Sequence, residues 1–299
     1  MAPDNAIALP RPPHAGTAER PVIVQRTWVD SRTVDLRIAS RFVHAVLPVR
    51  VLLPRDGHIR RGRRRPVLLL LQGGHDDYTS WTRETDVAAF TADKGLLTVM
   101  PSTGPTGIPT RWSPNNPEGA DYEKFLLVEV MGVLERDFNA GRARAVAGVS
   151  TGGYGAMALA ARHPGAFRAA ASYSGILHTT APLMPELVGA IVAREGLDPD
   201  SLWGSSILQR QQWEEYNPYR RAEGLAGTAL YVSSGTGGVT DEAARLEALL
   251  YPAAEAFALR LSALHIPATV RLYHGGGHSW PYWQRQFKDS WPLIERALG

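Results

Sequence analysis

The chain has 299 residues, 44% of them hydrophobic, and its formal net charge at pH 7 is only +3. This length and composition fit one large domain with a sizeable core, and the small net charge argues against a nucleic-acid-binding role. Because the chain contains no cysteine, it can form no disulfide bond and cannot use a thiol in catalysis.

The N-terminal 20 residues are rich in proline and alanine and lack both the basic start and the apolar run of a secretory signal. We therefore expect a disordered arm over residues 1–20, followed by a single domain over residues 21–299. No stretch approaches the roughly 18 to 20 apolar residues that a membrane-spanning helix requires. The default expectation is a cytoplasmic protein, with the mature form of an exported protein as the alternative. The basic run at residues 60–65 is most simply a solvated loop, and contact with an anionic membrane or polymer is the less favoured alternative.

Short apolar runs bounded by turn residues predict strands along most of the chain. In the later part they alternate with helical patterns, which indicates an α/β fold with a mostly parallel sheet covered on both faces. Core-facing apolar stripes predict one helix within residues 127–138 and another within residues 254–264, which we expect to begin at or near Pro252. The predicted strands cover residues 22–29, 34–39, 47–53, 67–71, 96–100, 145–149, 169–173, 228–234 and 268–273.

The pentapeptide at residues 148–152, Gly-Val-Ser-Thr-Gly, has the pattern G-x-S-x-G and lies between a predicted strand and a helix rich in small residues. At such a strand-to-helix turn a serine is held in a strained backbone conformation with its hydroxyl exposed, and the flanking glycines relieve the crowding. The pentapeptide alone occurs by chance in glycine-rich chains, so its position between strand and helix is what favours Ser150 as a nucleophile.

A serine nucleophile needs a base and a carboxylate that orients the base, and in α/β-hydrolases these follow the serine in the order acid, then histidine. Asp241 and His278 each follow a later predicted strand, so the predicted triad is Ser150, Asp241 and His278. Glu242 is an alternative acid, since Asp241 could instead cap a helix. His274 lies on the same loop as His278, but three glycines before His278 free the chain to turn inward.

The tetrahedral intermediate needs backbone N–H groups that bind its oxyanion. Thr151, directly after the nucleophile, is expected to supply one donor. Gly74, on the loop after the predicted strand 67–71, is expected to supply the other, because glycine lets the backbone approach the oxyanion. Gln72, His75 and Tyr154 are candidate substrate-binding residues.

Two polar segments could suggest a bound ion or phosphate, but each has a simpler explanation. Three adjacent polar residues at 75–77 rarely face one metal ion, so we expect a solvated loop there. The glycine-rich residues 235–238 are followed by no Lys-Ser/Thr pair, so they predict a turn rather than a phosphate cradle. We therefore expect neither a metal nor a cofactor.

The least regular segment, residues 174–227, lies between two late predicted strands, where this fold often inserts a lid. It contains many apolar residues. These either line an acyl-binding site over the active site or pack against the main sheet, and the sequence favours neither.

Motifs spread along the chain resemble the esterase D and mycolyltransferase (antigen 85 type) branch of the α/β-hydrolases. Residues 76–81 resemble that family's D-D-Y-x-x-W, residues 112–114 its W-x-S-P segment, and residues 278–283 its H-S-W-x-x-W. The likeness runs from about residue 47 to the C-terminus and implies the α/β-hydrolase fold. The mycolyltransferases use a glutamate as the triad acid, which keeps Glu242 open. The site residues that the resemblance implies are Ser150, Asp241 and His278 as the triad, Gly74 and Thr151 as oxyanion donors, and Trp280 in the substrate cleft.

The chain departs from the family near the oxyanion loop. In the mycolyltransferases this loop begins Leu-Asp-Gly, and the aspartate and a nearby arginine help to bind trehalose, whereas Gln72 and His75 stand near those places here. The family's paired cysteines are also absent. The resemblance therefore implies acyl-ester chemistry without implying trehalose recognition.

These observations favour a serine hydrolase that cleaves a small-molecule or lipid-like acyl ester through an acyl-enzyme. An acyltransferase is the nearest alternative, because a sugar or other alcohol could replace water as the acceptor. A binding protein that keeps the fold without turnover is the lesser alternative.

Overall fold

The computed structural model describes residues 21–55, 64–116 and 118–299. The arm expected over residues 1–20, and residues 60–63 of the basic run, lie outside the described residues. Within the described ranges, no helix is long and apolar enough to cross a bilayer.

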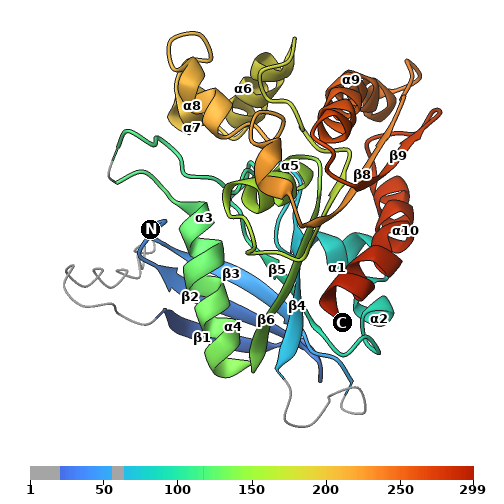
Figure 1. Cartoon of the computed structure of the whole chain (residues 1–299). Coiled ribbons are helices and arrows are strands. Elements are labelled where there is room, and N and C mark those ends of the chain that lie inside the picture. Colours follow the sequence, from blue (N-terminus) through green and yellow to red (C-terminus); the bar gives the residue numbers. More distant parts are fainter. Residues whose placement is uncertain (1–20, 56–63, 117) are drawn as a thin grey trace, which may run out of the picture.

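The described residues form one nine-stranded sheet in the order β1-β2-β3-β5-β4-β6-β7-β8-β9 (Figure 1). From β1 to β5 neighbouring strands pair antiparallel, and from β5 to β9 they pair parallel. Every strand predicted from the sequence is present. The strands are β1 (Val22–Trp28), β2 (Thr33–Ser40), β3 (Ala45–Leu52), β4 (Arg65–Leu71), β5 (Leu97–Pro101), β6 (Ala140–Val149), β7 (Ala169–Tyr173), β8 (Ala229–Gly235) and β9 (Ala268–Tyr273).

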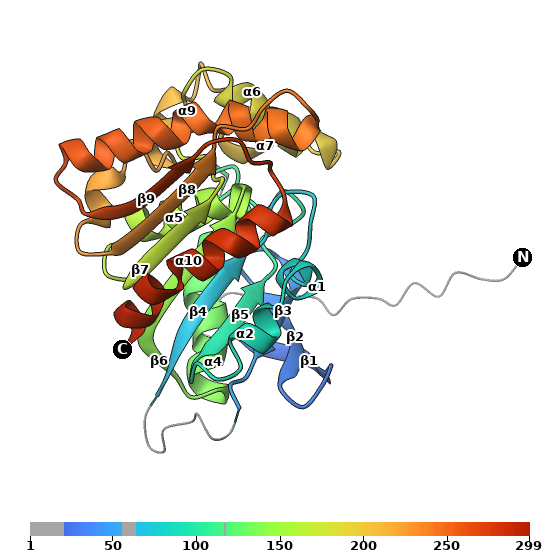
Figure 2. The same ribbon diagram turned by 90° about the vertical axis from the view of Figure 1, so that its right-hand side faces the viewer.

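Helices cover both faces of this sheet, as the alternation of strand and helix patterns predicts. Side chains of α1, α2 and α10 are buried against one face, and side chains of α4, α5 and α9 against the other. Figure 2 shows α10 lying across the parallel strands. The helical segments are α1 (Ser80–Glu84), α2 (Val87–Phe90), α3 (Tyr122–Lys124), the π-helical turn η2 (Phe125–Val130), α4 (Met131–Asp137), α5 (Thr151–Arg162), α6 (Met184–Arg194), α7 (Asp200–Trp203), α8 (Arg210–Glu215), the 3-10 turn η3 (Ala222–Leu225), α9 (Glu242–Ala263) and α10 (Trp280–Leu298).

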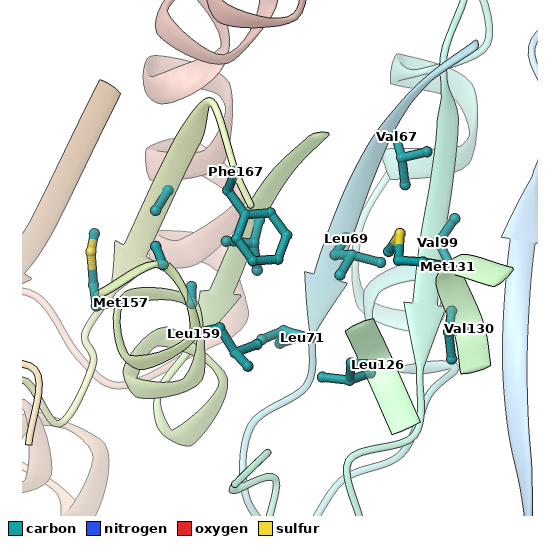
Figure 3. Close-up of a cluster of buried hydrophobic side chains, with 14 of the residues drawn as sticks. Val67, Leu69, Leu71, Val99, Leu126, Val130, Met131, Met157, Leu159 and Phe167 are labelled. Carbon is teal, nitrogen blue, oxygen red and sulfur yellow. The ribbon is translucent and has the colours of Figure 1, made fainter. Parts of the chain in front are cut away.

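The central strand β4 shows how the sheet divides the core. Successive side chains of a strand point to opposite faces, so a strand buried on both sides is apolar throughout. Leu69 and Leu71 belong to the cluster under α4 and α5, which Figure 3 shows, whereas Leu68 and Leu70 belong to the cluster under α10. Because residues 67–71 are buried on both faces of the sheet, the loop that follows β4 is attached to a tightly packed strand.

The segment between β7 and β8, which we call the insertion (residues 174–227), carries α6, α7, α8 and η3. Figures 1 and 2 place α6 at the same end of the molecule as α9. The insertion shares a buried cluster with α5 and α9, in which the ring of Trp203 stacks on that of Tyr216 at 5.5 Å and meets that of Trp213 edge-on at 5.0 Å. Much of its apolar content is therefore buried within the insertion and against these two helices.

Helix α9 was expected to begin at or near Pro252, but this expectation is wrong. The helix begins at Glu242, ten residues earlier, and Pro252 lies inside it. Asp241 is the N-cap residue, and its carboxylate accepts a hydrogen bond of 2.8 Å from the N–H of Ala244. Proline inside a helix lacks the N–H that would bond four residues back, a loss of about 3 kcal/mol. Leu250 and Ala254, on either side of the proline, are buried. This packing of α9 outweighs the missing hydrogen bond.

Candidate active site

Ser150 forms a sharp turn between the end of β6 and the start of α5. Its backbone has φ 54° and ψ −122°, a left-handed conformation that costs a non-glycine residue about 1–3 kcal/mol. A Cβ atom on Gly148 would lie 2.2 Å from the carbonyl oxygen of Gly152, and one on Gly152 would lie 2.3 Å from that of Gln72. Both glycines of the pentapeptide are therefore required by close backbone approach, and the turn projects the serine hydroxyl from the end of the sheet.

His278 reaches this serine from the loop after β9. Its Nε2 lies 2.9 Å from Ser150 Oγ, within hydrogen-bonding distance. The imidazole is held by a backbone hydrogen bond from His278 N–H to Ala243 O, 3.0 Å, and by the edge-on ring of Trp283. His274, the alternative base, is exposed at the start of the same loop. The structure thus brings His278, and not His274, to Ser150.

The carboxylate beside His278 is Glu247, so the expectation that Asp241 occupies this place is wrong. Glu247 Oε2 lies 3.2 Å from His278 Nδ1, on the side of the ring opposite Ser150. Asp241 instead caps α9, and Glu242 is the exposed first residue of that helix. The carboxylate that meets His278 thus comes from the second turn of α9 rather than from the loop before it.

Glu247 is fully buried and heavily hydrogen-bonded. Its Oε1 accepts hydrogen bonds from the N–H of Gly235 at 2.6 Å, from Ser174 Oγ at 2.9 Å and from Ser234 Oγ at 3.1 Å. Burial would raise the pKa of this carboxyl, but the hydrogen bond and charge of His278 and the hydrogen bonds from Gly235 and Ser174 hold it below its ordinary value. Glu247 is therefore a buried carboxylate that remains ionised at neutral pH.

The sequence contains a pattern that points to Glu247, but the helix start expected near Pro252 excludes this residue from the pattern. The apolar stripe predicted through Ala254 and Phe257 extends back, at helical spacing, through Leu250 to Glu247. A glutamate on a core-facing stripe must be paired or hydrogen-bonded, which marks it for a special role. With a helix start expected near Pro252, Glu247 falls outside the predicted helix, so the prediction does not include it in the stripe.

The loop after β4 lies directly against the serine turn. A Cβ atom on Gly73 would be 3.4 Å from Ser150 Cβ, and one on Gly74 would be 3.6 Å from Thr151 Cγ2. Thr151 is the first residue of α5, and the N–H groups of a first helical turn have no acceptor within the helix. The backbone of Gly74 and Thr151 therefore borders the space in front of Ser150.

A pocket of about 700 Å³ opens at this point, between the loop after β4, the insertion and α9. Its apolar walls come from Leu187 and Ile191 on α6 and from Leu246 and Leu249 on α9. Ser150, Thr151 and His278 border it, as do Gly74, His75 and Trp280. Part of the insertion thus lines the pocket, while much of the rest lies in the buried cluster that it shares with α5 and α9.

Two of the candidate substrate-binding residues lie away from this pocket. Gln72 is buried, and its Nε2 donates to the carbonyl oxygens of Asp76 at 2.5 Å and Gly104 at 3.0 Å, so it shapes the loop from behind. Tyr154 is buried in the cluster of the insertion, where its hydroxyl donates to the Tyr216 carbonyl at 2.9 Å. The expectation that these two side chains meet substrate is therefore wrong, because both are buried outside the pocket and donate to backbone carbonyl groups.

The polar residues at 75–77 are engaged separately. His75 Nδ1 is hydrogen-bonded to Glu195, Asp76 pairs with Arg83 at 2.6 Å, and Asp77 Oδ1 accepts from the N–H of Thr79 at 2.7 Å. No group of three or more His, Cys, Asp or Glu side chains that could hold a metal ion occurs within residues 21–55, 64–116 and 118–299.

Comparisons with known proteins agree with this geometry. The family model described as "Putative esterase" matches residues 42–294. The chain is 29% identical over 290 residues to the diacylglycerol acyltransferase/mycolyltransferase Ag85C of Mycobacterium leprae, covering 89% of this chain and 86% of the relative. It is 33% identical over 206 residues to the MPT51/MPB51 antigen of Mycobacterium tuberculosis, covering 62% and 66%.

Solved structures show the same fold. The crystal structure of Mycobacterium tuberculosis MPT51 matches with a TM-score of 0.74 and 26% identity, over 90% of this chain and all of that one. An S-formylglutathione hydrolase from Agrobacterium tumefaciens matches with a TM-score of 0.72 and 17% identity, over 93% and 99%. The chain belongs to the putative esterase family of α/β-hydrolases, in the esterase D and mycolyltransferase branch, and is an enzyme of the esterase or acyltransferase type.

Proposed function

We propose that this enzyme hydrolyses carboxylic esters through an acyl-enzyme, with Ser150 as nucleophile, His278 as general base and Glu247 as the acid that orients it. The observation that carries the proposal is the unbroken hydrogen-bonded chain from Ser150 Oγ through the His278 imidazole to buried Glu247. A serine hydroxyl becomes an effective nucleophile only beside such a base, and the base needs a fixed tautomer.

The reaction begins when Ser150 Oγ attacks the ester carbonyl carbon while His278 Nε2 takes the hydroxyl proton. Glu247 accepts the Nδ1–H bond, which keeps Nε2 free as the proton acceptor and stabilises the imidazolium that forms. The N–H groups of Gly74 and Thr151 bind the oxyanion of the tetrahedral intermediate. That intermediate collapses as His278 returns the proton to the leaving alcohol, and the acyl group stays on Ser150.

Water then attacks the acyl-enzyme carbonyl, with His278 again taking a proton, and a second collapse releases the acid and restores Ser150. The substrate is a small-molecule or lipid-like acyl ester. The apolar walls of the pocket, from α6 and α9, support binding of a hydrocarbon part beside the reacting carbonyl.

Acyl transfer to an alcohol is the second candidate, because relatives of this chain carry the name diacylglycerol acyltransferase/mycolyltransferase. The same acyl-enzyme serves both reactions, and the acceptor decides the product. The buried position of Gln72 favours hydrolysis, since this side chain offers no polar group to an incoming sugar. Incubation with an activated acyl ester and candidate alcohols, with free acid and transfer product measured together, separates the two.

The proposed nucleophile is tested with a fluorophosphonate probe, which labels activated serines. Wild-type protein should be labelled and should hydrolyse activated esters, and Ser150→Ala should do neither. A wild type that is neither labelled nor active would instead favour a binding protein that keeps the hydrolase fold.

A further inference from the structure

The loop after β4 is bonded to the insertion at the edge of the active-site pocket. His75 lies on that loop, and Glu195 is the C-cap residue of α6, 120 positions later in the chain. His75 Nδ1 and Glu195 Oε1 are hydrogen-bonded, with side chains only 22% and 21% exposed. The two other carboxylates on this loop, Asp76 and Asp77, both pair with Arg83. The pair is thus a specific link between two segments that the sequence keeps far apart.

A second contact joins the same two segments one residue earlier. A Cβ atom on Gly74 would lie 3.4 Å from Cγ2 of Ile191, so the side chain of Ile191 packs directly over this glycine. Ile191 and Glu195 are separated by four positions, one helical turn, and therefore share a face of the α6 end. Helix α6 contacts the loop at two consecutive residues, Gly74 and His75.

The backbone at His75 is in a conformation that the local sequence does not favour. Its φ is 61°, in the left-handed region, and its N–H donates to the carbonyl oxygen of Pro105 at 2.8 Å. Such a conformation persists where surrounding contacts hold it. The bond to Glu195 and the bond to Pro105 hold the residue that directly follows Gly74, the proposed oxyanion donor.

We propose that His75 and Glu195 form a latch through which α6 of the insertion positions the Gly74 N–H for the oxyanion. This inference rests on the proposed function. His75 is a positioning residue that acts through Gly74, and its Nδ1 is engaged with Glu195 rather than with substrate. Oxyanion binding, and with it the rate of acylation, thereby depends on how α6 of the insertion packs against the loop after β4.

The test compares His75→Ala, Glu195→Ala and the double variant in steady-state hydrolysis of a short activated ester, p-nitrophenyl acetate. Loss of a whole oxyanion donor lowers kcat by about 10²–10³, so displacement of a donor that remains present should lower kcat by about tenfold. KM should stay within about twofold, because oxyanion bonds act in the transition state. The double variant should be no slower than the slower single variant, since either change opens the same latch.

Glu195→Gln keeps an oxygen that accepts the Nδ1–H bond and should restore most of the activity that Glu195→Ala loses. Glu186→Ala, which removes an exposed carboxylate at the other end of α6 and outside the pocket, is the matched control and should leave kcat unchanged. Thermal unfolding of every variant shows whether the fold is intact, and Glu195→Gln remains informative if an alanine variant unfolds.

Three results in the variants would overturn the latch. Wild-type kcat in His75→Ala would mean that the link positions nothing. A raised KM with unchanged kcat would make His75 a substrate contact, and multiplying effects in the double variant would mean that the two residues act separately. A wild type without turnover or fluorophosphonate labelling would overturn the proposed function as well, whereas an active wild type with unaffected variants removes the latch alone.

Discussion

The two sides of the pocket are held in different ways. Behind Ser150 the groups are buried: Glu247 is fully enclosed, and Trp283 Nε1 donates to Ser174 Oγ, which in turn donates to Glu247. On the opposite side, Leu187 and Ile191 of α6 are only half-buried, and the His75–Glu195 link is partly exposed. Regions with fewer buried contacts open at lower free-energy cost than the core. We infer that the proposed nucleophile, base and acid are held by the rigid side, whereas the insertion side carries the proposed latch and the apolar wall that can adjust to substrate.

The rigid side should give the largest effects. Ser150→Ala and His278→Ala should each lower kcat for an activated ester by about 10⁴–10⁶-fold, because nucleophile and base act as one unit. His274→Ala, which removes an exposed histidine from the same loop, is the matched control and should retain most activity. Equal losses in the two histidine variants would contradict the assignment of the base.

The next largest effect is expected from substitution of the proposed triad acid, Glu247. Glu247→Gln should lower kcat by up to about 10⁴-fold, because an amide can hold His278 in the wrong tautomer. Asp241→Ala should keep most of the activity while lowering the free energy of unfolding, because it removes the hydrogen bond that caps α9. Ester hydrolysis and urea unfolding, measured on both variants, check this crossed pattern. High activity in Glu247→Gln would remove Glu247 from the triad.

The buried carboxylate should also leave a signature in the pH dependence of stability. The folded-state pKa of Glu247 lies below its ordinary value of 4.5, so its ionised form contributes stability above that value. This contribution is lost as the pH falls through the folded-state pKa. Urea unfolding of wild type and Glu247→Gln between pH 7 and pH 3 should therefore show a steeper loss in the wild type below about pH 4.5. Parallel curves would mean that Glu247 is not held ionised by its partners.

The insertion side should give the smallest and most selective effect. Leu187→Ala shortens the apolar wall, and full burial of such a side chain is worth about 1.5–3 kcal/mol. We expect kcat/KM to fall by about tenfold or more for the ester chain that reaches this wall and to change little for acetate esters. A series of p-nitrophenyl esters of increasing acyl length measures this. A uniform loss over the whole series would show that the wall does not contact the acyl chain.

Features of the structure that depend on residues close together in the chain could be predicted from the sequence. Short continuous apolar runs predicted the strands, because a strand in a sheet covered on both faces is apolar on both of its sides. The turn at Ser150 was also predictable, because it depends on two glycines within the same five residues. The prediction that Gln72 and Tyr154 bind substrate was wrong, because their polar groups donate to the carbonyl oxygens of Gly104 and Tyr216, which are distant in the chain.

By itself, the sequence determined where the strands lie along the chain, the sharp turn at Ser150, and the loops that carry His278 and Gly74, the proposed base and oxyanion donor. These depend on local periodicity and on backbone sterics, which short segments carry. Only the tertiary structure decided that Glu247 rather than Asp241 meets the imidazole, and that α6 bonds to the loop after β4. The first depends on where α9 starts and the second on how α6 packs against segments distant in the sequence, and burial of apolar surface rather than local preference decides both.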